Sequence, residues 1–506
     1  MPSADLRSLS ALELARGLRE KRWSSVELIQ LHSERIRQVN PRINAMVRNR
    51  FSAALAEARR VDEALAAGQE LPAFAGLPCS INECFALTGM PQTAGLVARR
   101  GHLACQDAPA VARLRAAGAI PLGVTNVSEL CMWMESANKL YGRTRNPYDD
   151  SRIVGGSSGG EAAIVAAGGA PFGLGSDVGG SIRMPAFFNG IFGHKPSGGL
   201  VPNTGQFPVA QGEWALRILC TGPLCRRAED LWPLLQILAG PDGQDAGCRP
   251  GRLRSPTTVD LQKLRVLDVQ GNGRQAVSGE LLDAQSRAAG HLESLGARHG
   301  SKRFDGLKDS FLIWSAMLSE ADPRPYKSLL GQGRAKPALP ELGRWLLGRS
   351  PHTFPSVGLA LLEDLAKLSP GLRRRSLRLG EELKAELSEA LDEKTVLLYP
   401  SYTRVAPRHN RPIFTPFDWV YTAIWNAMEL PVTQVPLGLN AQGLPLGVQV
   451  VGAPGADHVC VAVAMELERA FGGWVPPQVR GSGARGLVQE GKAGHDFLWV
   501  QADEKI

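Results

Sequence analysis

Apolar residues recur every three to four positions at the start of the chain, which is the spacing of amphipathic helices. Residues 11–31 show this spacing, and Ser24 or Ser25 stands where a helix cap is expected, just before the segment VELIQLHSERIRQV. A further segment of this kind, rich in alanine and arginine, runs from about residue 51 to residue 67. The pattern therefore predicts helices over most of this part of the chain.

Strand-like and helix-like segments alternate after this point. The apolar run 76–81 is followed by the helix-like VARLRAAG and by a second apolar run at 119–124. Two later helical segments and two later buried strands are predicted at residues 226–238, 281–295, 397–399 and 446–451. Alternation of this kind predicts a mixed or parallel sheet with helices packed against it.

Other segments depart from this alternation. Residues 249–263 are polar and contain proline, which predicts a surface insertion and not a domain boundary. Residues 339–368 are apolar and broken by prolines, which suits a cap or the wall of a groove as well as it suits a pair of buried helices. After Pro477 the sequence turns to glycine, serine and charge. We therefore expect a single domain over residues 1–478 and a poorly ordered extension over residues 479–506.

The composition is that of a globular protein, with 44% apolar and 21% charged residues and a formal charge of +8. The basic residues are scattered, and no nucleic-acid-binding motif accompanies them. The densest basic run, residues 373–378, lies beside glutamates on a predicted helix, where opposite charges can interleave. We therefore expect a solvated basic surface and no nucleic-acid partner.

The eight cysteines are widely spaced, with no CxxC pair and no histidines at the spacing of zinc ligands. We therefore expect no metal site and no cofactor. No signal peptide and no stretch of 18 apolar residues is present in the sequence, which predicts reduced thiols in a cytoplasmic protein without a transmembrane helix. The sequence leaves the oligomeric state open, with a homodimer as one alternative.

Glycine and serine are densest at the centre of the chain, which reads GGSSGGEAAIVAAGGAPFGLGSDVGGSIRMPAFFNGIFGHKPSGG from Gly155. Ser157 and Ser158 lie in one glycine turn, and Ser181 lies in another. An alanine-rich helical stretch separates the two turns and can fold them together. Serine turns of this kind suit acyl transfer, which needs a nucleophile, donors for a developing oxyanion and a proton acceptor.

The stretch SDVGGS can supply the oxyanion donors. Glycines without side chains let consecutive amides point the same way and form an anion-accepting nest. The predicted donors are the N–H groups of Val178, Gly179, Gly180 and Ser181.

This central segment resembles the amidase-signature family, whose members use a Ser–cisSer–Lys triad. The resemblance implies that Ser181 is the nucleophile and that Ser157 is the bridging serine, which relays the nucleophile's proton. Asp177 and Arg183 match the same motif, and we expect them to brace the turn by pairing or by backbone hydrogen bonds.

Ser158 and Glu161 also match the motif. A capping role at the start of the alanine-rich helix explains them as well as chemistry does.

Further segments extend the resemblance to the fatty-acid amide hydrolase branch of that family, from about residue 10 to residue 477. They read SELCMWMESANKLYGRTRNPYD, CTGPLC, PSVGLALLE, LPVTQVPLGLN and GLPLGVQVVG. The resemblance implies an α/β amidase-signature fold, with a large central mixed sheet covered by helices on both faces and a core signature at about residues 76–205. It also implies hydrolysis of long-chain fatty-acid amides to a fatty acid and ammonia or an amine.

The chain departs from the family at the catalytic lysine. In the segment GLPCSINECFALTGM, Asn82 stands where the resemblance places that lysine, and neither Ile81 nor Glu83 is a lysine. An amide side chain is not basic, so Asn82 cannot be the general base. We expect Asn82 to hold Ser157 by hydrogen bonds instead.

Three interpretations of Asn82 remain open. Activity survives through another acceptor, with Glu83, His194 or bound water as candidates; the chain is a silent homologue that binds amides or lipids; or Asn82 is a variant of an otherwise active enzyme. For His194 and Lys195 a structural role behind the site is favoured over proton transfer. A glutaminase-type amidotransferase subunit is a further alternative for the whole chain.

Apolar residues on both sides of the signature are candidates for contacts with the acyl chain of a small-molecule amide substrate. Those near the motif are Met132, Trp133, Met134 and Phe188. Trp345 and Phe354 belong to a second cluster with Leu346, Leu347, Leu359 and Leu361. That second cluster can line an acyl channel, touch a membrane surface or pack in the core.

Overall fold

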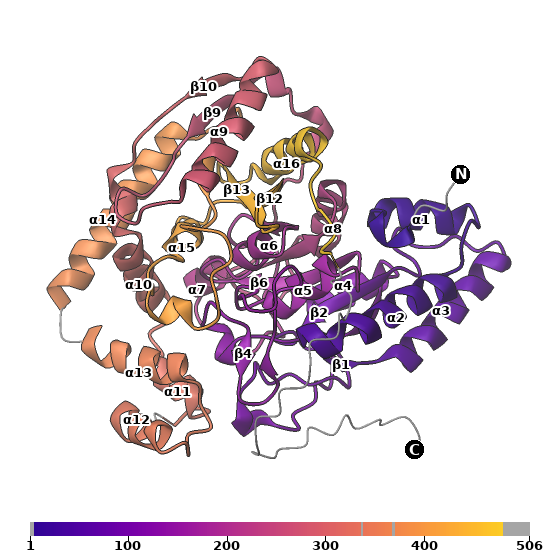
Figure 1. Cartoon of the computed structure of the whole chain (residues 1–506), viewed down its shortest axis with the longest axis horizontal. Helices are drawn as coiled ribbons and strands as arrows, with labels where there is room; N and C mark the ends of the chain where they lie inside the picture. Colours follow the sequence, from indigo (N-terminus) through magenta and orange to yellow (C-terminus); the bar gives the residue numbers. More distant parts are fainter. Residues whose placement is uncertain (1–4, 335–336, 367–369, 479–506) are drawn as a thin grey trace.

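The computed structural model describes residues 5–334, 337–366 and 370–478 (Figure 1). The predicted extension over residues 479–506 lies outside the described residues. One mixed sheet of 11 strands crosses the molecule, in the order β1-β3-β2-β6-β8-β7-β12-β13-β11-β9-β10. The strands are β1 (Met46–Asn49), β2 (Pro78–Asn82), β3 (Ile120–Thr125), β6 (Phe172–Asp177), β7 (Phe192–Lys195), β8 (Cys220–Cys225), β9 (Arg265–Asp268), β10 (Arg298–Gly300), β11 (Thr395–Pro400), β12 (Val432–Leu439) and β13 (Pro445–Gly452).

Parallel and antiparallel pairs alternate in blocks along this sheet. Strand β2 pairs in parallel with β3 and β6, and β9 pairs in parallel with β10 and β11. The pairs between β6 and β11 are antiparallel, and so is the pair of β1 with β3. The two buried strands predicted near the C-terminus, β11 and β13, are neighbours in this sheet. The expectation of a large mixed sheet is confirmed.

Most helices in the first half of the chain lie at segments for which the sequence predicts helices. They are α1 (Ala11–Arg19), α2 (Ser25–Ile43), α3 (Phe51–Ala66), α4 (Pro109–Ala116), α5 (Gly159–Ala166), α6 (Arg183–Phe188), α7 (Glu213–Ile218) and α8 (Leu231–Leu238). Ser24 is the cap of α2, because its side chain accepts from Glu27 N while the Glu27 carboxylate accepts from the Ser24 amide. This reciprocal capping box decides between Ser24 and Ser25.

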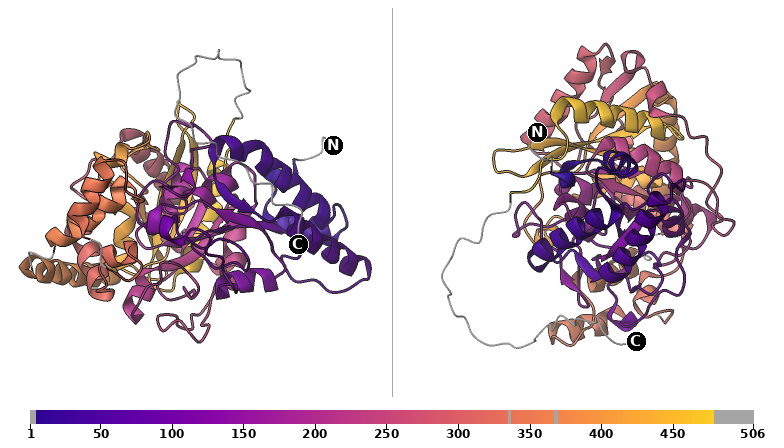
Figure 2. Two further views of the ribbon diagram at one scale, coloured as in Figure 1. Left: turned by 90° about the horizontal axis from the view of Figure 1, so that it is seen from below. Right: turned by 90° about the vertical axis from the view of Figure 1, so that its right-hand side faces the viewer.

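The remaining helices are α9 (Gly279–Ser294), α10 (Ser310–Ala321), α11 (Tyr326–Leu330), α12 (Ala338–Leu346), α13 (Phe354–Ala366), α14 (Pro370–Ala390), α15 (Val420–Ala427) and α16 (Asp457–Phe471). The N-terminal helices and helices α11–α13 lie at opposite ends of the molecule (Figures 1 and 2). Residues 249–263, predicted as a surface insertion, contain only short 3-10 turns.

Helices cover both faces of the sheet, as two successive residues of β7 illustrate. Side chains alternate between the faces of a strand. Gly193 lies against Ala186 of α6, where an added Cβ would come within 2.8 Å of the alanine. The next residue, His194, faces the other way and contacts Asp457 of α16 at 3.1 Å. Helix α6 therefore covers one face of the sheet and α16 the other.

The proline-broken segment forms helices α12 and α13, but three leucines in and just after α12 are not core residues. Leu339, Leu346 and Leu347 are each at least 70% exposed. Core packing is therefore excluded for Leu346 and Leu347. Among the described residues, no helix combines the length and the apolar character that crossing a membrane requires.

Candidate active site

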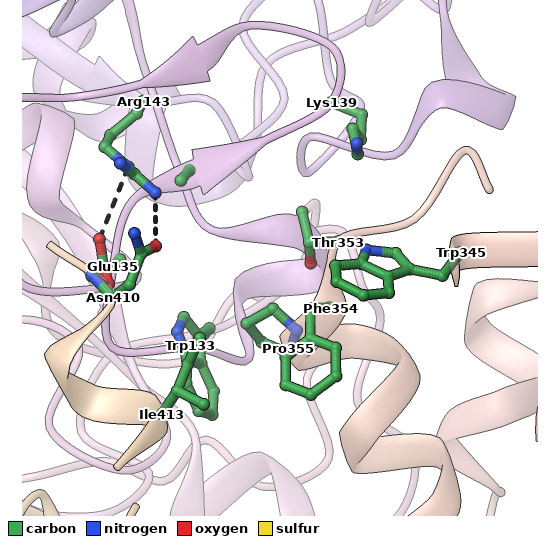
Figure 3. A pocket seen from close by; sticks show the side chains of 11 residues that line it. Trp133, Glu135, Lys139, Arg143, Trp345, Thr353, Phe354, Pro355, Asn410 and Ile413 are labelled. Carbon is green, nitrogen blue, oxygen red and sulfur yellow. Dashed lines mark hydrogen bonds and ion pairs between the residues drawn. The ribbon is translucent and has the colours of Figure 1, made fainter. Parts of the chain in front are cut away.

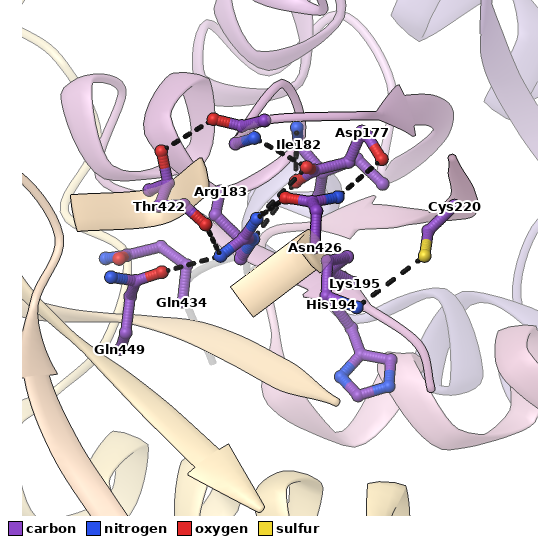
Figure 4. A network of polar contacts seen from close by, with 12 residues as sticks. Asp177, Ile182, Arg183, His194, Lys195, Cys220, Thr422, Asn426, Gln434 and Gln449 are labelled. Carbon is purple, nitrogen blue, oxygen red and sulfur yellow. Dashed lines mark hydrogen bonds and ion pairs between the residues drawn. The ribbon is translucent and has the colours of Figure 1, made fainter. Parts of the chain in front are cut away.

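Ser181 lies in the short turn between strand β6 and helix α6, and 8% of its surface is exposed. The turn is held by Asp177 at the end of β6 and Arg183 at the start of α6. Arg183 Nε and Nη2 each donate to one carboxylate oxygen of Asp177 at 3.0 Å, and both side chains are fully buried (Figure 4). The expected pairing of these two residues is confirmed.

Asp177 also binds the backbone of the turn it supports. Its carboxylate accepts from Gly180 N at 2.6 Å and from Ile182 N at 3.1 Å. Burial raises the pKa of Asp177, but the charge and hydrogen bonds of Arg183, together with Lys195 and the Ile182 amide, outweigh burial, and the pKa lies below its ordinary value. The carboxylate is therefore ionised at neutral pH and fixes the turn as an acceptor.

Helix α15 also supports this turn. Thr422 Oγ1 donates to Gly179 O at 2.9 Å, and Asn426 Nδ2 donates to Asp177 O at 2.8 Å. Arg183 reaches the same helix through Thr422 O and Asn426 Oδ1. Thr422 and Asn426 have no signal in the sequence, because they lie more than 200 residues after the turn they hold.

Three of the four predicted oxyanion donors are unpaired. Within the described part of the chain, the N–H groups of Val178, Gly179 and Ser181 donate to no protein acceptor. The fourth, Gly180 N–H, is bound to Asp177 Oδ1 and is not available to an oxyanion in this arrangement. The prediction of a four-donor nest is corrected to one of three donors, because the bracing carboxylate takes the fourth.

Two tryptophans pack against the donor turn and were not among the predicted site residues. Trp314 Nε1 donates to Val178 O at 2.8 Å, and the rings of Trp314 and Trp419 meet edge to face at 4.7 Å. A Cβ added to Gly179 would lie 2.9 Å from the Trp419 ring. The glycine therefore permits close approach of an aromatic wall to the Ser181 turn.

The turn that carries Ser157 lies directly beside the Ser181 turn. The Gly156–Ser157 peptide bond is cis, as the resemblance implied for the bridging serine. Ser158 N donates to Ser181 O at 3.2 Å, which joins the two turns through the backbone. Within the described residues, neither Ser157 Oγ nor Ser181 Oγ has a hydrogen-bond partner. The turns that carry the two predicted serines are therefore neighbours, and both serine hydroxyl groups are free of partners among the described residues.

Ser136 is a supporting residue that the sequence reasoning missed. Its Oγ lies 3.1 Å from Gly155 O and 2.9 Å from Ser157 O, and it accepts from Gly159 N at 2.9 Å. The hydroxyl therefore satisfies the first amide of helix α5 and fixes the cis turn. Ser158 occupies the cap position but makes no side-chain capping bond, so the capping interpretation of Ser158 is wrong.

Asn82 lies at the end of strand β2 and is fully buried. Its Nδ2 donates to Ser158 Oγ at 2.9 Å, and its Oδ1 accepts from Cys84 N at 2.9 Å. The expected hydrogen bond to Ser157 is therefore replaced by one to Ser158. Both polar groups of Asn82 are engaged, so Asn82 fixes the serine turn without offering a proton acceptor.

Glu83 and His194, the other predicted acceptors, are engaged elsewhere. Glu83 accepts from Thr93 N, Thr93 Oγ1, Ala94 N and Tyr141 Oη, at 2.6 to 2.8 Å. Burial raises the pKa of Glu83. His194 lies between Thr433 Oγ1 and Asp457 Oδ1, at 2.8 and 3.1 Å. Neither group contacts Ser157 or Ser181, and the structural role favoured for His194 is supported.

Lys195, which follows His194, is fully buried. Its Nζ donates to Pro196 O at 2.7 Å. The same Nζ lies 3.6 Å from Cys220 Sγ (Figure 4).

A further buried carboxyl lies one helical turn from Ser158. Glu161 of α5 accepts from Ser80 Oγ of β2 and, at 2.6 Å, from Thr125 Oγ1 of β3. Burial raises the pKa of Glu161 to about 8. Glu161 thus ties the helix that begins at the serine turn to the strand that ends at Asn82.

A cavity of about 460 Å³ is lined by residues of the segments 133–143, 345–355 and 410–413 (Figure 3). Trp133, Trp345 and Phe354, three of the predicted substrate-binding residues, line it. The rings of Trp345 and Phe354 lie 4.9 Å apart. The backbone of Trp133 separates the cavity from the Ser157 turn, since a Cβ added to Gly156 would lie 2.1 Å from Trp133 O.

The remaining predicted substrate contacts do not line this cavity. Phe188 is fully buried between Phe187 and Tyr402, with ring centroids 5.2 and 5.1 Å away. Met134 is buried, and Met132 packs against the main core. Phe188 and Met134 are therefore core residues, although both lie close to the motif in sequence. The strands and helices around them cover their side chains.

Among the described residues, no group of three or more His, Cys, Asp and Glu could hold a metal ion.

Comparison with known proteins agrees with this geometry. The Amidase family model matches residues 27–461. Fatty-acid amide hydrolase 2-A of Danio rerio is 49% identical over 93% of this chain and 90% of its own length. A glutamyl-tRNA(Gln) amidotransferase subunit of Cyanothece is 31% identical over 91% of this chain and 98% of its own length. The solved structure of 6-aminohexanoate cyclic dimer hydrolase with its substrate has a TM-score of 0.79 at 25% identity, covering 94% of this chain and 99% of that one.

The fold and these relatives place the protein in the class of amide hydrolases, which cleave C–N bonds. The chain belongs to the amidase-signature family.

Proposed function

We propose that the chain hydrolyses fatty-acid amides or related acyl amides through a covalent acyl-enzyme at Ser181. The observation that carries the proposal is the set of three unpaired N–H donors around Ser181, in a turn held by the buried Asp177–Arg183 pair. Preorganised donors stabilise the oxyanion of a tetrahedral intermediate, and each contributes about 3 kcal/mol. The 49% identity to a fatty-acid amide hydrolase supports the substrate class.

In the proposed reaction, Ser181 Oγ attacks the amide carbon, and the carbonyl oxygen takes the negative charge. The serine proton leaves through Ser157 toward solvent water, and the leaving nitrogen gains a proton as the C–N bond breaks. Water then attacks the ester and releases the fatty acid. Because Asn82 is not basic, we expect the first step to be slower than in a chain with lysine, by a factor on the order of 10² to 10⁴.

A silent amide-binding protein is the second candidate function, and the Asn82–Ser158 hydrogen bond favours it. An asparagine fixed at both polar groups leaves the serine pair without a protein base. The glutaminase-type amidotransferase alternative ranks lower, because the identity to that relative is 31% against 49% for the fatty-acid amide hydrolase.

Labelling with a fluorophosphonate probe tests the proposal, because the probe reacts with an activated serine and not with one that only binds ligand. We expect covalent labelling at Ser181, located by peptide mass spectrometry, and its loss in Ser181→Ala. Absence of labelling in a folded protein would favour the silent alternative. Release of ammonia from glutamine without hydrolysis of lauroyl or oleoyl amides would favour the amidotransferase alternative.

A further inference from the structure

The cavity beside the Ser157 turn combines an aromatic wall with a charged rim. Trp133, Trp345 and Phe354 form much of its apolar surface, while Lys139 and Arg143 lie on the hairpin across from these rings (Figure 3). The hairpin consists of β4 (Ala137–Asn138) and β5 (Gly142–Arg143). A cavity lined in this way suits an apolar ligand with one polar end.

Two of the three charged residues at the rim are paired with each other. Glu135 is buried. Its carboxylate accepts from Asn410 N at 2.6 Å, lies 3.2 Å from His409 Nδ1 and forms an ion pair with Arg143 Nε at 3.6 Å. Arg143 Nη2 also donates to Asn410 Oδ1 at 2.7 Å. Glu135 and Arg143 therefore satisfy each other within the protein.

The third charged residue, Lys139, takes no part in this network. It is exposed at the cavity, and within the described residues its ammonium makes neither an ion pair nor a hydrogen bond. An uncompensated cation at the rim of an apolar cavity favours an anionic end group over a neutral or cationic one.

The hairpin that carries Lys139 is held firmly at this position. The buried Asn138 accepts from Leu140 N and Tyr141 N at 3.0 and 2.7 Å, and donates to Val127 O at 2.8 Å. Tyr141 Oη donates to Glu83 Oε1 at 2.8 Å. The backbone that carries the cation is thus fixed before any ligand binds, which lowers the entropic cost of binding.

We propose that this cavity binds an amphiphile made of a long apolar chain ended by a carboxylate, with the chain against the aromatic wall and the carboxylate on Lys139. Two ligands share this chemistry: a free fatty acid, and an N-acyl amino acid whose carboxylate lies beyond its amide. The proposal concerns binding alone. It does not depend on hydrolysis at Ser181, and the test below uses no turnover.

The test is titration calorimetry of the full chain with laurate, N-lauroylglycine, lauramide and dodecyltrimethylammonium. We expect saturable binding of at least one of the two carboxylates, with lauramide weaker and the cation weakest. The tighter of the two carboxylates identifies the source of the ligand. Lauramide or the cation binding as tightly as both carboxylates would overturn the proposal, as would no binding of either carboxylate.

Lys139→Met removes the charge and keeps an apolar stem. We expect it to weaken carboxylate binding about fivefold or more, leave lauramide unchanged and abolish the salt dependence of carboxylate binding. Lys139→Arg should keep the affinity, and Lys263→Met, an exposed lysine paired with Asp260, serves as the matched control. Unchanged carboxylate affinity in Lys139→Met would refute the role of the cation, and unchanged affinity for all ligands in Trp345→Ala would refute the site.

Discussion

Asn82 Nδ2 donates to Ser158 Oγ at 2.9 Å, so the residue that the resemblance places at the family's lysine position is tied to the serine next to the cis serine. The asparagine thereby preserves the geometry of the serine turn while supplying no base. A lysine at this position could both hold the turn and accept a proton, whereas Asn82 only holds the turn.

Asn82→Lys is expected to raise turnover of oleamide or an aryl amide at least about a hundredfold, because it restores a side chain that can accept the serine proton. Asn82→Gln, which is neutral and longer than asparagine, is the control and should give no gain. The measurement is kcat/KM with folding monitored by circular dichroism. No gain for the lysine variant, with folding unchanged, would argue against a latent hydrolase.

Arg183→Met is expected to lower the free energy of unfolding by about 3–5 kcal/mol, because it leaves the buried Asp177 carboxylate without its partner. Arg378→Met breaks an ion pair with Glu382 whose side chains are 72% and 60% exposed, and should change stability by less than about 1 kcal/mol. Urea denaturation of both variants checks this. Equal losses in the two variants would contradict the bracing role.

We expect the free energy of unfolding to depend on pH through the protonation of Glu161. Its pKa in the folded chain, about 8, lies above the ordinary value of 4.5, so the folded state holds the proton more tightly than the unfolded state. The stabilisation is fully present below pH 4.5 and is lost as the pH rises toward 8, by up to about 1.4 kcal/mol per pH unit. Glu161→Gln should flatten this slope in urea titrations at about pH 5, 7 and 8.5. The same slope in the variant would show that other groups cause it.

Phe354→Asp is expected to reduce long-chain turnover about tenfold more than short-chain turnover, because it places a charge in the apolar wall of the cavity. Leu347→Asp, at a position 71% exposed just after α12, should affect neither. Specificity constants for oleamide and a short aryl amide test this, in the Asn82→Lys background if native turnover is low. An equal effect on both substrates would end the channel interpretation.

Much of the architecture could be predicted from the sequence, because it depends on local spacing. Helices α1 to α4 and strands β2 and β3 follow the apolar periodicity closely, and the glycine-serine turns are evident from composition. The pairing of Asp177 with Arg183 was also predictable, since the two residues flank one turn. Contacts that span more than 200 residues, such as Thr422 with Gly179, leave no such trace.

The sequence by itself determined the chemical inventory: the serines at 157 and 181, the glycines that free the amides beside them, and the asparagine at 82. Only the tertiary structure decided how these groups are used. It assigned Gly180 N–H to Asp177, turned Asn82 toward Ser158, and placed Phe188 in the core while Trp345 and Phe354 line a cavity. The physical reason is that a hydrogen bond or a buried surface requires a partner, and the partner's position is set by the packing of strands and helices that are distant in the chain.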